Sequence, residues 1–162
     1  MTYEERVKAA IDAIDEAQVA QVIEALRIAP TVYVLGNGGS HANAAHLVLH
    51  LRDAGIPAFD VLGDPTWLSA CSNDTAYDLS PAAYLRVEQP GDTLVVLSGS
   101  GRSENVLYAL QNYSGPKIGF LGSSGGEAAQ LCDIVVALKE TEYGPIEDAH
   151  SVILHMIAEA LK

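Results

Sequence analysis

The sequence contains two copies of one pattern, in which a short apolar strand runs into a glycine-rich loop and then into a helix. In the first copy TVYVL (31–35) precedes GNGGS (36–40), and in the second TLVVLS (93–98) precedes GSGRS (99–103). Apolar strands that alternate with helices are typical of a parallel sheet buried between two layers of helices. The pattern therefore predicts an α/β fold.

The remaining segments extend this alternation over the whole chain. Residues 2–29 read as one long helix, because Thr2 and Glu5 fit a capping box and apolar residues recur at helical spacing up to Pro30. The other patterns predict helices over 41–52, near 65–72, from the second loop to about Asn112, near 125–131 and over about 145–161, strands over 57–62, 117–122 and 133–138, and an acidic turn at 72–74. No linker divides the chain, so we expect a single domain over residues 1–162.

Composition and charge exclude several classes of protein. The net charge is −12 and the sequence pI is near 4.6, so no nucleic-acid partner is expected. The acidic N-terminus does not fit a signal peptide, and no apolar run approaches the roughly 18–20 residues of a membrane span. The two cysteines, Cys71 and Cys132, favour the reducing cytoplasm, although a disulfide between them stays open.

The two glycine-rich loops are candidate phosphate sites. In an open parallel sheet, ligands bind beyond the carboxyl ends of the strands, where backbone amides and helix dipoles attract anions. Serine hydroxyls add donors there, and the candidates are Ser40, Ser98, Ser100 and Ser103. The loops match neither the dinucleotide-binding nor the Walker pattern, which argues against both classes of nucleotide-binding protein. The alternative is that both loops are merely tight turns, for which glycine is the default residue.

All five histidines fall in two short windows. His46 and His50 are four residues apart in a predicted helix, which places both imidazoles on one face, about 5–6 Å apart and close enough to share a metal ion. His155 and Glu147 in the last helix could complete the site, although an ideal helix separates them by about 12 Å in rise. Glu147 would then lie at a frayed helix start or come from a neighbouring subunit. The remaining histidines are interpreted as structural or supporting residues: His41 and His150. The alternative for any of the five is a hydrogen-bonded core residue.

Four segments carry a family resemblance: GNGGSHANAAH (36–46), CSND (71–74), GDTLVVLSGSGRSEN (91–105) and IEDAHSVILH (146–155). They resemble the sugar isomerase (SIS) domain family, and most closely its phosphoheptose isomerases. The resemblance implies a flavodoxin-like three-layer sandwich with a five-stranded parallel sheet and a long N-terminal oligomerisation helix within residues 1–30. It also implies a homotetramer, or a dimer, with active sites between subunits. These isomerases use zinc and convert sedoheptulose 7-phosphate into an aldoheptose phosphate.

Carried over by position, the resemblance assigns phosphate and sugar contacts to the two loops and the CSND segment, namely Asn37, Gly38, Ser40, Asp74, Ser98, Ser100 and Ser103. It assigns metal ligation to His46 and His155. The chain also departs from the family. His50 stands where the family has a Glu, its proposed catalytic base, and Glu147 stands where the family has a Gln. An expected Arg and an expected Asp are replaced by Ala54 and Gly144.

These assignments predict a metal-dependent aldose–ketose isomerase that works through an enediol. Four side chains are expected to hold a divalent metal, namely His46, His50, Glu147 and His155. Zinc is the first candidate, with Ni, Co, Mn or Fe as alternatives. The proton transfer needs a base and an acid, and the catalytic candidates are Glu147, His155 and His50. One alternative is a non-catalytic SIS tetramer that binds a sugar phosphate or a partner protein, like the relative that binds the replication initiator. Another is a tetramer with a purely structural metal.

Overall fold

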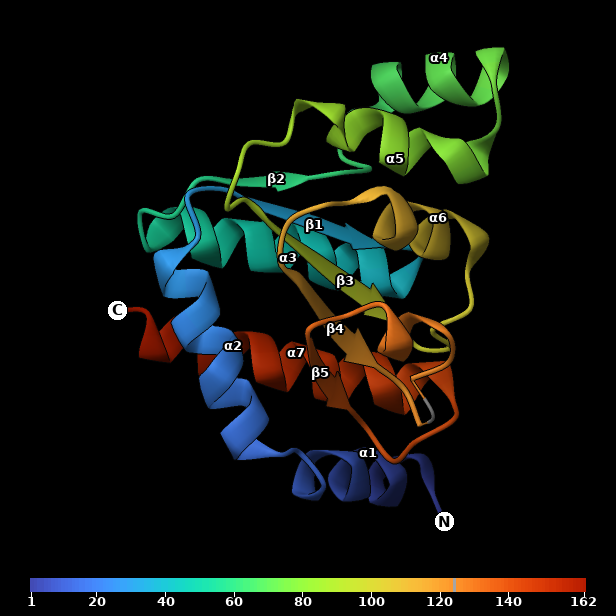
Figure 1. Cartoon of the computed structure of the whole chain (residues 1–162). Coiled ribbons are helices and arrows are strands. Elements are labelled where there is room, and N and C mark those ends of the chain that lie inside the picture. The colour runs from blue at the N-terminus through green and yellow to red at the C-terminus, as the bar shows by residue number, and fades with distance from the viewer. Residues whose placement is uncertain (124) are drawn as a thin grey trace.

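The computed structural model describes residues 1–123 and 125–162. Its centre is a sheet of five parallel strands in the order β2–β1–β3–β4–β5 (Figure 1). The strands are β1 (Val32–Gly36), β2 (Ala58–Asp60), β3 (Thr93–Ser98), β4 (Lys117–Leu121) and β5 (Ile134–Ala137). β1 and β3 are parallel neighbours, so the two glycine-rich loops leave the sheet side by side at the carboxyl ends of these strands. This strand order is flavodoxin-like and confirms the expected α/β sandwich.

Helices cover both faces of the sheet (Figure 1). One face is covered by α1 (Tyr3–Asp12), α2 (Glu16–Ile28), α3 (Gly39–Asp53) and α7 (Tyr143–Ala160), and the other by α6 (Glu104–Asn112) and the 3-10 helix η3 (Ala128–Gln130). Successive side chains of a strand point to opposite faces. Val34 accordingly packs in the core under α3 and α7, whereas Tyr33 and Leu35 pack in the core under α6.

A small helical lobe follows β2 and projects from the layered core (Figure 1). It contains α4 (Pro65–Asp74), the 3-10 helix η1 (Tyr77–Leu79), α5 (Ser80–Tyr84) and the 3-10 helix η2 (Leu85–Val87). The acidic turn expected at 72–74 is wrong, because these residues are the last turn of α4. The amide and the hydroxyl of Thr75 both donate to the Cys71 carbonyl, at 2.9 and 2.7 Å, and end the helix there.

The N-terminal segment forms two helices, so the single long helix expected over 2–29 is wrong. The predicted capping box is present: the Glu5 amide donates to Thr2 Oγ1 at 3.3 Å, and the Thr2 amide donates to Glu5 Oε2 at 2.8 Å. After α1 ends, the Asp15 carboxylate accepts hydrogen bonds from the amides two and three residues ahead and starts α2. An Asp side chain favours such caps over a helix interior, which explains the break.

One helix in the C-terminal half also differs from expectation. The helix expected near 125–131 is only the short η3. Gly125 and Gly126 precede it with φ of +66° and +55°, a left-handed conformation that glycine adopts readily and that an α-helix excludes. This difference comes from a backbone conformation that the apolar pattern does not record. The last helix, α7, covers Tyr143–Ala160, in agreement with the helix expected over about 145–161.

The two cysteines, Cys71 and Cys132, are free thiols, so the disulfide left open by the sequence is not formed. Burial raises the pKa of the Cys132 thiol to about 11, which keeps the thiol protonated near neutral pH. The described part of the chain also contains no helix that is both long and apolar enough to cross a membrane.

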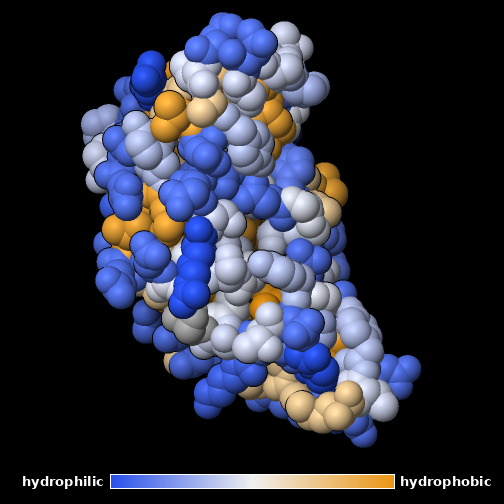
Figure 2. All heavy atoms as spheres, turned by 90° about the vertical axis from the view of Figure 1, so that its right-hand side faces the viewer, coloured by the Kyte–Doolittle hydropathy of each residue, from blue (hydrophilic) through white to orange (hydrophobic). Residues whose placement is uncertain are grey.

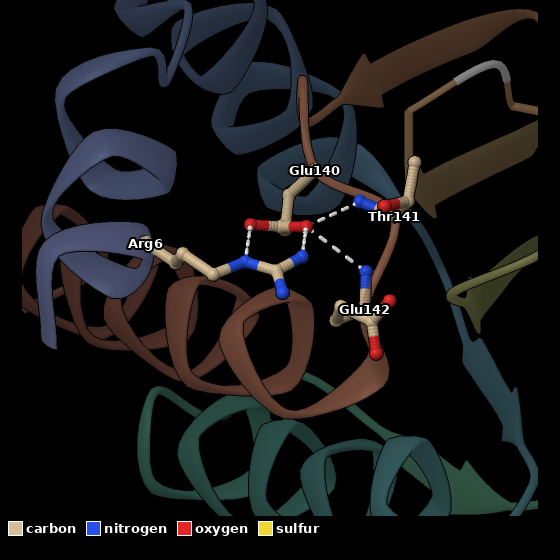
Figure 3. A network of polar contacts seen from close by, with 4 residues as sticks. All are labelled: Arg6, Glu140, Thr141 and Glu142. Atoms are coloured by element: carbon tan, nitrogen blue, oxygen red, sulfur yellow. Dashed lines mark hydrogen bonds and ion pairs between the residues drawn. The ribbon is translucent and has the colours of Figure 1, made fainter. Parts of the chain in front are cut away.

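An ion pair ties α1 to the segment that leads into α7 (Figure 3). Arg6 donates to the Glu140 carboxylate through Nη2 and through Nε, the latter at 3.0 Å. The amides of Thr141 and Glu142 donate to the same carboxylate. Glu140 is only 8% exposed, and the hydrogen bond from Arg6 followed by those of the amides lowers the pKa of Glu140 to about 2. The carboxylate therefore fixes the chain just before α7 begins.

Replacing Glu140 by Gln should destabilise the fold at neutral pH but not in strong acid. Because the folded state lowers the pKa of this carboxyl from 4.5 to about 2, its stabilisation is complete above pH 4.5 and is lost as the pH falls toward 2. Urea unfolding of the wild type and of Glu140→Gln should give free energies of unfolding that differ at pH 7 and converge between these two values. Asp12→Asn, which breaks the exposed ion pair of Lys8 and Asp12, is the control and should change little. A difference that persists undiminished at pH 2 would contradict the assignment.

Candidate active site

The carboxyl ends of β1 and β3 open into a small pocket of about 50 Å³. Figure 2 looks onto this end of the molecule, where hydrophilic residues make up most of the surface. The polar side chains that line the pocket come from both glycine-rich loops and from the start of α7: Asn37, Ser40, Ser98, Ser100, Ser103, Tyr143 and Glu147. The structure therefore brings together Asn37 and all four serines that the sequence assigned to substrate.

The first loop turns sharply into α3 and leaves room for a carboxylate. Gly38, at the N-cap of α3, has a φ of +57°, a region that favours glycine, and it lies exposed at the turn. Gly39 follows, and a Cβ at this position would lie 2.1 Å from Oε2 of Glu147. The Glu147 carboxylate consequently lies against the N-terminus of α3, where the helix dipole favours negative charge.

The second loop uses its own serine hydroxyls as acceptors. Ser98 Oγ accepts from the Gly101 amide at 3.0 Å, and Ser100 Oγ accepts from the Arg102 amide at 3.2 Å. A hydroxyl that accepts such a bond keeps its proton for donation to a ligand. Ser103 is the N-cap of α6, and its hydroxyl makes no capping hydrogen bond within the described chain. The loop thus presents three hydroxyl donors at a helix N-terminus.

Asn37 is held by two residues that the sequence analysis did not single out. Its Nδ2 donates to Asn105 Oδ1 at 2.9 Å, and its Oδ1 accepts from Asn105 Nδ2 at 2.9 Å. The Tyr77 hydroxyl donates to the same Asn37 Oδ1 at 2.7 Å. Asn105 lies in the first turn of α6 and is 2% exposed, whereas Tyr77 belongs to η1 of the helical lobe. The sequence did contain a signal for Asn105, because a polar residue two positions after Ser103 stands at the start of an otherwise apolar helix.

Three histidines form a cluster between α3 and α7. The ring centroids of His46 and His50 are 4.4 Å apart, and those of His46 and His50 lie 5.1 and 5.3 Å from that of His155. One nitrogen of each ring lies within 4.8 Å of the others, and His50 Nε2 is buried without a hydrogen-bond partner among the described residues. Burial, followed by the charges of the other two histidines, lowers the pKa of His50 and favours the neutral imidazole that metal ligation requires. The donor set therefore fits a divalent metal.

Glu147 lies apart from this cluster. Among the described residues, the group close enough to share an ion contains the three histidines without Glu147, whose carboxylate lines the pocket. The separation agrees with the rise of about 12 Å between Glu147 and His155 on one helix. Asn43 Nδ2 donates to the Glu147 carbonyl at 2.8 Å and joins the two helices between the pocket and the cluster. Within one chain, the four side chains expected to share an ion therefore lie in two places, a histidine cluster and a carboxylate in the pocket.

Asp74, which the resemblance assigned to the sugar site, lies elsewhere in this chain. It is the last residue of α4 and lines a separate cavity of about 600 Å³ between the helical lobe and α6, together with Trp67, Arg86 and Tyr108. The Asn73 Nδ2 donates to its Oδ1 at 3.0 Å. Within one chain, Asp74 and the serine loops therefore line different cavities.

The other two histidines lie outside the histidine cluster. His41 Nε2 lies 3.0 and 2.9 Å from the two carboxylate oxygens of Asp60, at the end of β2. His150 is completely buried, with its ring 6.2 Å from that of Phe120, and burial lowers its pKa to about 4. Neither residue belongs to the histidine cluster, in agreement with their interpretation as structural residues.

Comparison with known proteins places this arrangement in a family. The model of the SIS domain matches residues 2–114. The phosphoheptose isomerase of Pelobacter propionicus is 31% identical in an alignment 156 positions long, gaps included, that covers 88% of this chain and 81% of that protein. The structure of a phosphoheptose isomerase from Francisella tularensis covers 98% of this chain and 93% of its own, with a TM-score of 0.91 and 25% identity. That of the phosphoheptose isomerase from Neisseria gonorrhoeae covers 99% and 95%, with a TM-score of 0.92 and 24% identity. The chain therefore belongs to the SIS domain family and, within it, to the phosphoheptose isomerases.

Proposed function

We propose that this chain is a metal-dependent aldose–ketose isomerase that acts on sedoheptulose 7-phosphate or a related sugar phosphate. The observation that carries the proposal is the pocket in which Glu147 faces the serines of both loops. Such a pocket combines an anion site with a titratable carboxylate, which is what proton transfer on a phosphorylated substrate requires. Membership of the phosphoheptose isomerases supports the same reaction.

The serine loops would hold the phosphate group. Ser98, Ser100 and Ser103 offer hydroxyl protons, while the N-termini of α3 and α6 offer backbone amides and the positive ends of two helix dipoles. These donors lie at the ends of adjacent strands and converge on one small pocket. A sugar held there by its phosphate has its carbon atoms beside Asn37 and Glu147.

Glu147 is the proposed base. It takes the proton from the carbon beside the carbonyl and returns it to the former carbonyl carbon, while the hydroxyl proton passes to the former carbonyl oxygen, so that ketose and aldose interconvert through an enediol. Family members resembling this chain carry a Glu at the position of His50. The carboxylate that handles the proton would thus come from α7 in this chain and not from α3.

The histidine cluster is the proposed metal site. His46, His50 and His155 would hold the ion, with zinc as the first candidate and Ni, Co, Mn or Fe as alternatives. When bound, the metal would supply Lewis-acid polarisation of substrate oxygens. His50 and His155 are also candidates for proton transfer. Either residue could take that role only while its imidazole does not ligate the ion.

We further propose a homotetramer, or a dimer, with active sites between subunits. The described residues of α4 are all at least partly exposed, and Asp74 lies away from the serine loops of its own chain, as expected if α4 completes the site of a neighbouring copy. The same proposal includes a single domain over residues 1–162 and a role of residues 1–30 in assembly. Sedimentation velocity of the purified chain tests it, and a monomer at micromolar concentration would contradict it.

The separation of Glu147 from the histidines favours one alternative, a non-catalytic SIS protein that binds a sugar phosphate or a partner. Elemental analysis of the purified protein and a thermal-shift screen of pentose, hexose and heptose phosphates identify the metal and the ligand, and a turnover assay with that sugar phosphate separates the two. A bound ligand stabilises the folded state with the logarithm of its concentration over its dissociation constant, so a true substrate stands out. Absence of both metal and sugar-phosphate stabilisation would contradict the isomerase.

Glu147→Gln should abolish turnover while phosphate binding persists. The amide keeps the size of the side chain but cannot accept a proton, so we expect kcat to fall by about 10²-fold or more. The affinity for inorganic phosphate, measured by calorimetry, should stay the same or rise, because a negative charge leaves the pocket. Glu159→Gln, an exposed change on the same helix, is the matched control and should leave both quantities unchanged. Turnover retained in Glu147→Gln would reject Glu147 as the base.

His50→Ala should reduce the affinity for the metal. Loss of one of three imidazole ligands should weaken zinc binding by at least roughly tenfold, as measured by competition with a chromogenic chelator after dialysis. His41→Ala is the control, since His41 pairs with Asp60 outside the cluster. Equal zinc affinity in His50→Ala and in the wild type would place the metal elsewhere.

A further inference from the structure

The carboxamide of Asn37 is bonded so that its oxygen is fully used and its nitrogen is not. A carbonyl oxygen has two lone pairs, and Asn37 Oδ1 accepts from the Tyr77 hydroxyl at 2.7 Å and from Asn105 Nδ2 at 2.9 Å. The nitrogen carries two protons, of which one is donated to Asn105 Oδ1 at 2.9 Å. Because Asn37 lines the pocket, its second N–H is the group left to meet a ligand.

The surrounding bonds couple the orientation of the Asn37 amide to its two partners. If it turned over, its nitrogen would face Asn105 Nδ2, donor against donor, and its oxygen would face Asn105 Oδ1, acceptor against acceptor. Asn105 would have to turn over as well, and the Tyr77 hydroxyl, which donates to Asn37 at 2.7 Å and accepts from Asn105 Nδ2 at 3.4 Å, would have to exchange its two roles. Asn105 is 2% exposed, and an unpaired amide there would carry a desolvation cost. Tyr77 and Asn105 are therefore the two groups that hold the Asn37 amide with its nitrogen toward the pocket.

We propose that Tyr77 and Asn105 are positioning residues that fix Asn37 as a hydrogen-bond donor to the carbonyl oxygen of the sugar, and to the oxyanion that develops from it. The proposal rests on the proposed function, since it specifies the substrate atom that the pocket recognises. A donor aimed in advance at an oxygen whose negative charge grows during the reaction stabilises the transition state more than the bound substrate. Glu147 lines the same pocket, so the base and this donor are placed to act on neighbouring atoms.

The contribution of Tyr77 can be separated from general effects of the lobe. Tyr77→Phe removes one donor to Asn37 Oδ1 and keeps the ring, which is 43% exposed. Tyr108→Phe is the matched control, because Tyr108 of α6 is 40% exposed and lines the cavity between α6 and the lobe, and no described group bonds its hydroxyl. Asn105→Asp is the second variant, whose carboxylate still accepts from Asn37 but cannot donate to it.

The test measures kcat and KM for sedoheptulose 7-phosphate, together with the calorimetric affinities of this sugar phosphate and of inorganic phosphate. Loss of one hydrogen bond to a neutral partner should change a rate constant or an affinity by a factor of about three to ten. Tyr77→Phe and Asn105→Asp should each lower kcat by that factor, weaken binding of the sugar phosphate by up to the same factor, and leave the affinity for inorganic phosphate within about twofold. Tyr108→Phe should change none of these quantities.

Every other outcome contradicts either the positioning role or the proposed function. Wild-type kcat in Tyr77→Phe overturns the positioning role, and so do equal losses in Tyr77→Phe and Tyr108→Phe. A parallel loss of affinity for inorganic phosphate means that Tyr77 merely supports the loop, which also overturns the proposal. If the wild type binds sedoheptulose 7-phosphate without turnover, the isomerase fails, and the ratio of the two affinities in Tyr77→Phe alone then decides whether Asn37 is a positioned donor. If it binds no sugar phosphate, both proposals fall.

Discussion

The contact between α3 and α7 on one face of the sheet determines where the candidate functional groups lie. Its core consists of fully buried side chains from both helices, Leu47, Leu51, Ile153 and Leu154. At the end of this contact near the strand ends, the absence of a side chain on Gly39 lets the Glu147 carboxylate reach the first turn of α3. Farther along, the same contact brings His155 against His46 and His50. The pocket and the histidine cluster are therefore parts of one interface, roughly 10–12 Å apart along the helices.

The parts of the fold that could be predicted are those that a local pattern determines. The run TLVVLS is apolar on both faces, and its limits coincide with those of β3 because a central strand of a covered parallel sheet needs apolar side chains throughout. The break between α1 and α2 was missed because apolar residues continue at helical spacing through it, and the capping carboxylate of Asp15 alone marks it. The segment 75–87, with its short turns, has no apolar period from which its elements could be predicted.

The same distinction applies to the candidate site, where some features follow from a local pattern and others do not. The contact of His46 with His50 follows from a spacing of four residues on one helix, and the convergence of the serine loops follows from the adjacency of two parallel strands. The direction of Glu147, by contrast, depends on where α7 crosses α3, and no spacing within α7 contains that information. Asn105 and Tyr77 meet Asn37 across three separate elements, so their roles are visible only once the chain has folded.

Electrostatics explains why the orientation of a single amide matters in this pocket. The chain carries a net charge of −12, and among the described residues that line the pocket there is a carboxylate but neither Lys nor Arg. A phosphorylated ligand is therefore not attracted by net positive charge, and must be held by hydroxyls, amides and helix dipoles, which act over short distances and only when correctly directed. In a site built from neutral donors, recognition depends on geometry, and a donor turned the wrong way becomes a repulsive acceptor. The hydrogen bonds that fix Asn37 supply the directional control that a cationic pocket would not need.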